Sequence, residues 1–366
     1  MRSPAALLVL MILACGPSSV KAAAEAVPIS DPFLAVCVVS PGAQYTVVKG
    51  ALRPVRGEFS IAPRGVTPLL PRFLGAASAQ PGDLVRMYFS SADPVDSVRA
   101  EIRGPGSRLL SRGRGFEIMR DAEDPVWVII MGIPPSAVAS RYDLRVFAAA
   151  GSSSWQMLGD FNVLPREFLT EKLALTRELT ALVTVPDPRK TAESKRLAEV
   201  LATADPDAVY EDGPMLIPLG GARRTSGYGD RRVYQYSDGG AATSTHLGVD
   251  IASPVGTLVP ASGKGRVVFA APRILTGNTV IIEHLPGLFS VYYHMATLAV
   301  AVGDLVERGA TVGTVGMTGF ATGPHLHFEV EVEGTPVDPD ALSRAALLDK
   351  EPIFPDTELH FTGEGR

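Results

Sequence analysis

Short runs of β-branched and aromatic residues, each bounded by glycine or proline, dominate this 366-residue chain and favour a mainly β fold. Examples are Leu84–Phe89, Trp127–Met131 and Tyr142–Phe147, and turn signals such as Pro81–Asp83 separate them. The 36 glycines and 30 prolines are spread along the chain, which suits many short strands rather than helical bundles. This spacing predicts a β-sandwich, immunoglobulin-like in architecture, over residues 27–165.

The sequence changes character after this region. Leucines recur at helical spacing, and Asp187–Pro188 has the form of an N-cap and first-turn pair, so we expect a short helical connector over residues 166–212. Residues 213–345 return to glycine-rich, strand-like sequence with a hairpin signal at Pro286–Gly287, which predicts a second β domain. Residues 346–366 form a short acidic tail. The leucines that suggest the first connector helix are Leu169, Leu173, Leu175, Leu179 and Leu182.

The N-terminus has the layout of an export signal. A basic Arg2, the apolar run Ala5–Ala14 and a group of small residues predict a signal peptide over residues 1–26. The apolar run is too short to anchor the chain by spanning a bilayer. Cys15 closes a sequence that resembles a bacterial lipoprotein cleavage box, so a lipid on Cys15 is the one membrane attachment we expect. With Cys15 removed or lipidated, Cys37 is the remaining cysteine and no intrachain disulfide is expected.

All six histidines lie in the last third of the chain, and three motifs contain four of them. In His325-Leu-His327 the two imidazoles are two residues apart, so on a strand they point to the same face. His246 and Asp250 are four apart, and a bend near Gly248 could bring them to one ion. Imidazoles plus one carboxylate are a common zinc set, and a hydrolytic zinc keeps three protein ligands and one open position. The third motif ends an aromatic run at His294. The remaining histidines, His284 and His360, are interpreted as structural or surface residues.

The joint pattern resembles a known family, the M23 peptidases, which are the lysostaphin-like or LytM-type zinc endopeptidases of bacterial cell walls. The motifs that carry the resemblance follow one another in order along the C-terminal third of the chain. They are Ser226–Arg231, His246–Asp250, Pro254–Thr257, Gly277–Val280, Tyr293–His294, Gly316–Gly319 and Gly323–Glu329.

The resemblance implies an antiparallel β-sheet peptidase domain of the M23, duplicated-hybrid-motif type. It also implies that His246, Asp250 and His327 bind one zinc ion, and that His325 and His294 act on the substrate. A neutral His325 beside the metal is the better general base, and His294 would donate to the oxyanion formed during hydrolysis. No expected ligand is missing, which favours an enzyme over an inert relative.

Two loops are predicted to border the substrate groove. Residues 223–245 form a long polar segment and residues 318–324 a short glycine-rich one, and together they could hold an extended peptide. We expect Tyr228, Arg231 and Asn278 to contact the substrate.

The sequence thus predicts a secreted zinc metalloendopeptidase of the periplasm or cell envelope. It would use zinc-activated water to hydrolyse peptide cross-links or stem peptides of peptidoglycan. The net charge of -5 disfavours nucleic acid as a partner, because phosphate binding needs a basic surface. The alternative is a non-catalytic envelope protein that binds peptidoglycan or activates a cell-wall amidase. A lipoyl- or biotinyl-carrier barrel is disfavoured, because Lys264 lacks the flanking pattern that such a modified lysine needs.

Overall fold

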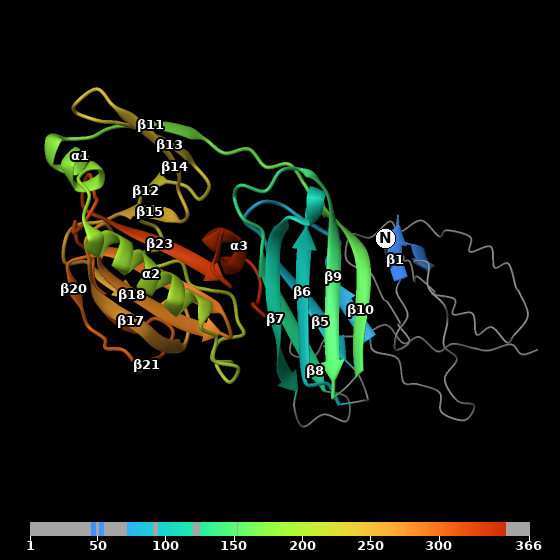
Figure 1. The fold of residues 1–366 in the computed structure, drawn as a ribbon. Coiled ribbons are helices and arrows are strands. Elements are labelled where there is room, and N and C mark those ends of the chain that lie inside the picture. Colours follow the sequence, from blue (N-terminus) through green and yellow to red (C-terminus); the bar gives the residue numbers. More distant parts are fainter. Residues whose placement is uncertain are drawn as a thin grey trace, which may run out of the picture.

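The computed structural model describes residues 45–48, 51–54, 72–90, 94–119, 125–151 and 153–348. The predicted signal peptide, the lipidation box at Cys15, Cys37 and residues 349–366 of the predicted tail lie outside these ranges. The described chain is mainly β, as the sequence predicts (Figure 1).

One continuous ladder of strands builds the N-terminal part, in the order β2-β1-β10-β9-β6-β7-β8-β5-β3 with β4 beside β10. Strand β7 pairs with β6 along its first half and with β8 along its second, so the ladder folds over a shared core. Met87 and Ile129 from one half pack with Ile102 and Phe161 from the other, all fully buried. The immunoglobulin-like assignment stays a prediction. The elements are β1 Tyr45–Val48, β2 Ala51–Pro54, β3 Arg72–Gly75, β4 Ser78–Ala79, β5 Leu84–Ser90, β6 Ser97–Arg103, the 3-10 turn η1 Pro105–Ser107, β7 Leu109–Met119, β8 Val126–Gly132, β9 Ser140–Ala150 and β10 Ser153–Val163.

The segment predicted as a helical connector contains two helices and one strand. Helix α1 (Arg177–Thr184) begins at Thr176, whose hydroxyl accepts from the Leu179 amide, and α2 (Pro188–Ala202) begins at Asp187. The expectation of helix around Leu169 and Leu173 is wrong: residues Thr170–Ala174 form strand β11, which pairs in parallel with β13. Leu169 is 72% exposed, so the leucine spacing there does not mark a buried helical face. Among the described residues, no helix is long and apolar enough to cross a membrane.

The C-terminal part is organised around an eight-stranded sheet of order β12-β15-β23-β19-β18-β17-β21, with β24 beside β23. Two three-stranded sheets, β11-β13-β14 and β16-β22-β20, flank it. The bounds are β12 Arg224–Ser226, β13 Arg231–Gln235, β14 Ala241–Thr245, β15 Val249–Ala252, β16 Leu258–Pro260, β17 Gly265–Arg273, β18 Gly277–Leu285, β19 Leu288–Met295, β20 Thr297–Leu298, β21 Leu305–Val306, β22 Thr311–Thr314, β23 His325–Val332, β24 Thr335–Val337 and α3 Pro339–Ser343.

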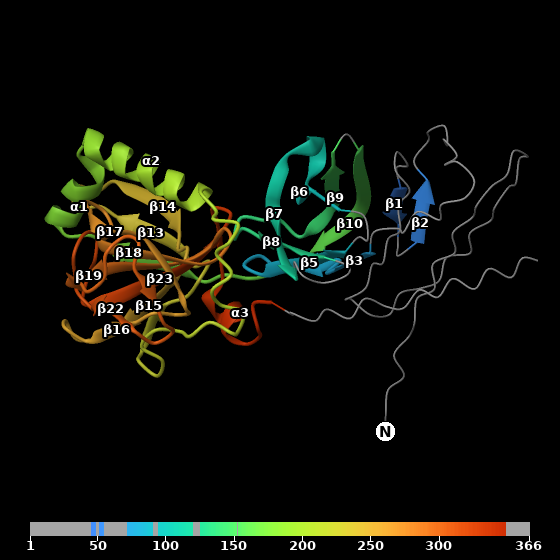
Figure 2. The ribbon, with the colours of Figure 1, turned by 90° about the horizontal axis from the view of Figure 1, so that it is seen from below.

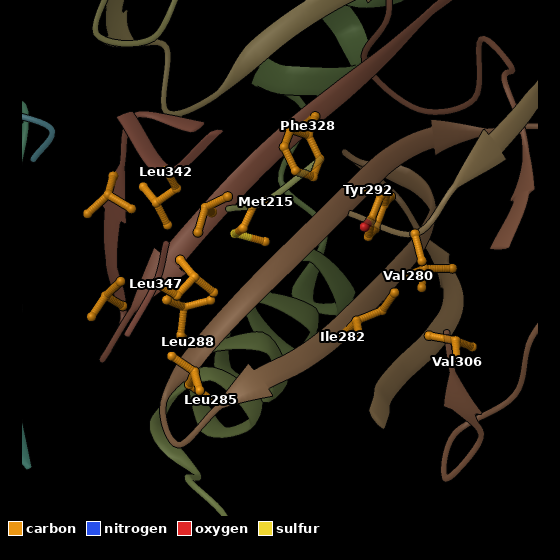
Figure 3. Packing of buried hydrophobic residues seen from close by; sticks show 14 of the residues in the cluster. Met215, Val280, Ile282, Leu285, Leu288, Tyr292, Val306, Phe328, Leu342 and Leu347 are labelled. Atoms are coloured by element: carbon orange, nitrogen blue, oxygen red, sulfur yellow. The ribbon is translucent and has the colours of Figure 1, made fainter. Parts of the chain in front are cut away.

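The two faces of the main sheet are covered differently. On one face, Phe328 of β23 and Tyr292 of β19 lie in a large apolar core (Figure 3) that also includes residues of β16 and β22. On the other face, Leu201 of α2 packs against Phe289 and Tyr293. Figure 2 shows α2 on one side of the sheet and β16 and β22 on the opposite side. Because side chains alternate along β23, its histidines share the face that α2 covers.

Polar contacts join the N-terminal strands to the C-terminal sheet. Arg114 of β7 binds both carboxylate oxygens of Glu333, at 2.9 and 3.1 Å. Arg166, which follows β10, binds Asp338 at the start of α3. Residues of β5, β7 and β8 also belong to the large apolar core of the C-terminal part. The two parts therefore pack as one body in this structure.

Acid should destabilise the fold through His284, which is fully buried on β18. Its Nδ1–H donates to the Lys264 carbonyl, and its Nε2 lies 2.7 Å from the Ser290 hydroxyl. Burial lowers the pKa of His284 from 6.5 to about 4, so the folded state prefers the neutral ring. This contribution to stability is fully present above the unfolded-state pKa of 6.5 and is lost as the pH falls toward the folded-state value of about 4. The stability lost over this pH range amounts to about 3 kcal/mol.

The check is the unfolding free energy in urea between about pH 7 and about pH 4. Protonation of carboxylates also destabilises the protein in acid. The pH dependence of the wild-type unfolding free energy is therefore compared with that of His284→Gln, which has no titrating group at this position. The variant should lose less stability over the same pH range. Equal pH dependence in the two proteins would contradict the assignment.

Candidate metal centre

Two histidines and one aspartate converge on a single point of the main sheet. Strands β15 and β23 are antiparallel neighbours, and their register sets Asp250 directly opposite His327. His246 precedes β15, and its Nε2 lies 3.1 Å from Asp250 Oδ1 and 2.9 Å from His327 Nδ1. His327 Nδ1 and Asp250 Oδ1 are 2.7 Å apart. All three residues are buried.

Gly248 allows the chain to bring His246 and Asp250 to the same side. A Cβ at Gly248 would lie 2.3 Å from the backbone oxygen of Phe328 on the neighbouring strand. Real Cβ atoms do not approach a backbone oxygen this closely, so the bend before β15 requires glycine here. The chain bends at Gly248, as predicted, and the close approach of β23 excludes a side chain there.

Hydrogen bonds on the outer side of the cluster determine which imidazole nitrogens face inward. His246 Nδ1 lies 2.7 Å from the Gly227 carbonyl, which can only accept, so His246 carries its proton there. His327 Nε2 lies 2.8 Å from Glu329 Oε1 and donates to that carboxylate. When both rings are neutral, as metal binding requires, the inward atoms His246 Nε2, His327 Nδ1 and Asp250 Oδ1 are all acceptors.

Three acceptors facing one another need a cation between them. Two imidazole nitrogens and one carboxylate oxygen form a donor set typical of zinc, and an outer carboxylate on a ligating histidine orients the ring and makes it a better ligand. The residues present therefore fit a divalent metal ion.

The same arrangement shifts the pKa values of His327 and Asp250. Burial alone would lower the pKa of His327, but hydrogen bonds to Asp250 and Glu329 raise it to about 9, so without an ion a proton on Nδ1 takes the place of the cation. Burial would raise the pKa of Asp250, and the bonds from His246 and His327 hold it well below its usual range.

Two further histidines lie beside the cluster. His325, two residues before His327 on the same face, has its Nε2 3.6 Å from Asp250 Oδ1. His294 ends β19, and its ring centre is 4.8 Å from that of His325 and 6.1 Å from that of His327. The structure thus brings together the five residues predicted to bind the metal or to take part in catalysis.

Both of these rings present Nε2 as an acceptor. His325 Nδ1 donates to the Gly323 carbonyl and His294 Nδ1 to the Thr318 carbonyl, each at 2.8 Å. Burial lowers the pKa of His325. Burial, together with the neighbouring His327 and His325, lowers the pKa of His294 to about 3. Neutral rings with a free Nε2 lone pair can accept a proton.

Two side chains at the cluster were not among the predicted site residues. Glu329 accepts from His327, and the alternation of β23 could have revealed it, because His325, His327 and Glu329 share one face. Arg232 of β13 binds Asp250 Oδ2. No local pattern identifies Arg232, since β13 lies in a different sheet from its partner.

The residues predicted to contact substrate use their polar groups within the protein. Tyr228 donates its hydroxyl proton to the Pro336 carbonyl. Arg231 binds Thr245 and, on the N-terminal side, the Pro135 carbonyl. Asn278 donates to the carbonyls that follow His294 and so supports the end of β19; these are the carbonyls of Met295 and Ala296.

The C-terminal part of the chain is also similar in sequence to known peptidases. Residues 244–339 match the family model of peptidase family M23. The chain is 43% identical over 94 residues to the DD-carboxypeptidase/endopeptidase Mpg of Neisseria meningitidis, covering 26% of this chain and 22% of that protein. It is 33% identical over 185 residues to the peptidoglycan DD-endopeptidase ShyA of Vibrio cholerae, covering 48% and 40%.

A solved structure is also similar. The catalytic domain of the prophage-encoded M23 protein EnpA of Enterococcus faecalis, crystallised as a variant, is 35% identical, with 33% of this chain and 91% of that chain covered and a TM-score of 0.29. The chain spans less than half the length of either curated relative named above.

Replacing Gly248 by alanine should damage the cluster without touching a ligand. The added Cβ must push β15 away from the Phe328 oxygen, so we expect the unfolding free energy to fall by about 1–3 kcal/mol. Zinc affinity, measured by competition with a chromogenic chelator, should fall as well. Gly220→Ala is the matched control, because its Cβ would meet nothing closer than 3.6 Å. Wild-type zinc affinity in Gly248→Ala would refute the requirement for glycine.

Proposed function

Because the C-terminal region of this chain is a peptidase family M23 domain, we propose that the protein is a secreted zinc metalloendopeptidase that cuts peptide bonds in bacterial peptidoglycan. The substrate bonds are peptide cross-links or stem peptides, and the names of the two curated relatives favour links between D-amino acids. The proposed site of action is the periplasm or cell envelope.

The observation that carries this proposal is the set of three inward-facing acceptors. His246 and His327 each have the outer nitrogen occupied by a hydrogen bond, so the inner nitrogens are available to a metal ion together with Asp250. A non-catalytic protein that binds peptidoglycan or activates an amidase would not need this set. Its completeness supports the enzyme over that alternative.

His246, Asp250 and His327 would hold the zinc ion. When bound, zinc supplies Lewis acidity and lowers the pKa of a coordinated water toward neutrality. Three protein ligands leave a position for that water.

His325 is proposed as the general base. Its Nδ1–H is held by the Gly323 carbonyl, which leaves Nε2 to accept a proton from the attacking water. The 3.6 Å separation from Asp250 Oδ1 places this nitrogen beside the ligand atoms. Positioned proton transfer of this kind is worth roughly 10²–10⁴ in rate.

His294 is proposed to stabilise the oxyanion that forms on the scissile carbonyl. Its Nδ1–H is already given to the Thr318 carbonyl, so Nε2 must first accept a proton before it can donate. The negative charge that develops on the scissile carbonyl oxygen would favour uptake of that proton by His294. His325, whose ring centre lies 4.8 Å away, would instead pass the proton taken from water to the leaving amine.

Activity on isolated peptidoglycan sacculi tests the proposed reaction. The zinc-loaded protein should release muropeptides, release should stop with a chelator and return with added zinc, and mass spectrometry should identify the bond cut. Binding to sacculi without release by the zinc-loaded protein would support the non-catalytic alternative.

Single substitutions separate metal ligands from proton-transfer groups. His246→Ala should abolish both zinc binding and hydrolysis, because two ligands do not hold the ion. His325→Ala and His294→Ala should keep zinc but lose most activity, by roughly 10²-fold or more. Zinc content and muropeptide release are measured on the same samples, and full turnover in any of these variants would refute its assigned role.

A further inference from the structure

Arg232 makes a contact that the proposed reaction does not explain. It lies on β13, in the small sheet β11-β13-β14, and its Nη2 donates to Asp250 Oδ2. The Arg232 side chain is only 14% exposed and that of Asp250 only 8%. A guanidinium carries a fixed charge and directional donors, so it orients a carboxylate strongly.

This contact divides the two oxygens of Asp250 between different partners. Oδ1 faces the two ligating imidazoles, at 3.1 Å from His246 Nε2 and 2.7 Å from His327 Nδ1. Oδ2 faces Arg232. A carboxylate can bind a metal ion through one oxygen or through both, and an oxygen that accepts from a guanidinium is the weaker ligand of the two.

We infer that Arg232 is a positioning residue that holds Asp250 to one-oxygen coordination and so keeps the remaining metal position open for water. This inference rests on the proposed metal-dependent hydrolysis. The Arg232 charge also withdraws electron density from Asp250, which makes the carboxylate a weaker donor and leaves the bound ion more acidic.

The strand that precedes the metal-binding region supports Arg232. Glu171 of β11 has its Oε2 3.7 Å from Arg232 Nε, and Ser226 donates to the same Glu171 oxygen at 2.6 Å. Strand β11 pairs with β13 along its whole length, with Glu171 opposite Arg232. A carboxylate from the connecting segment therefore lies behind the guanidinium that orients a metal ligand.

An ordinary ion pair in the same region provides the contrast. Arg224 of β12 binds both oxygens of Asp340, each at 2.6 Å, and both side chains are about one-third exposed. Within the described residues, the side chains of this pair make their ion pair with each other and not with the cluster, so we expect its loss to affect stability and not metal binding. Arg224→Gln is thus a matched control for loss of an arginine–aspartate pair.

The test compares full-length wild type with Arg232→Gln, Arg232→Lys, Glu171→Gln and the Arg224→Gln control. Cobalt(II) replaces zinc as a spectroscopic probe, because its visible absorption weakens as the coordination number rises. In Arg232→Gln the freed oxygen should join the ion, so the cobalt bands should weaken while zinc affinity stays unchanged or increases. The kcat on a soluble cross-linked muropeptide should fall about 10–100-fold with little change in KM.

The other variants should change the cobalt spectrum and kcat to smaller extents. Arg232→Lys keeps the charge but offers a less directional donor, so it should restore part of the cobalt spectrum and of kcat. Glu171→Gln should shift both in the same direction as Arg232→Gln but less, and Arg224→Gln should match wild type. A wild-type cobalt spectrum in Arg232→Gln would overturn the inference, as would weaker zinc binding with an unchanged spectrum. Wild type that binds neither cobalt nor zinc would instead refute the proposed function.

Discussion

The pairing of β15 with β23 is the constraint on which the metal centre depends. Asp250 faces His327 across this pair because Val249 faces Phe328 one residue earlier. Phe328 and Val249 belong to the apolar core, so burial of these side chains fixes the register. A slip of one residue would turn the apolar side chains out of the core and the ligands into it. The hydrophobic effect therefore positions the metal ligands.

The opposite face of β23 carries polar groups into a buried setting. His327, Glu329 and Glu331 follow one another on this face and are all buried. Burial, reinforced by Glu329, raises the pKa of Glu331 to about 8, so this side chain prefers to be protonated. Apolar residues of α2 and β19 cover the sheet alongside them. The structure thus surrounds the metal site with a low-dielectric wall, in which the charge of a bound cation is compensated by the nearby carboxylates.

Local sequence patterns predicted the features that depend on neighbouring residues alone, such as strand alternation and a bend at glycine. Alternation along His325–Glu329 predicted the strand and the shared face of the two histidines, and Gly248 marked the bend before Asp250. Contacts between distant segments were not predictable in this way. Leu169 and Leu173 have helical spacing, but pairing with β13 extends this segment as β11. Tyr228 and Arg231 lie in the motif region, yet contacts with distant segments occupy their polar groups. Tyr228 donates to the Pro336 carbonyl of β24, and Arg231 donates to the Pro135 carbonyl that follows β8.

The connecting segment is a structural part of the metal centre and more than a spacer. It leaves β10, is held by the Arg166–Asp338 ion pair, and continues directly into β11, where Glu171 lies behind Arg232. Helix α2 then returns across the sheet, and Glu193 on it accepts from the Ile274 amide near the end of β17. Each of these three interactions is a contact between side chains or between a side chain and the backbone. Because Glu171 and Asp250 both contact the Arg232 guanidinium, a shift of β11 would move Arg232 and with it the Asp250 carboxylate.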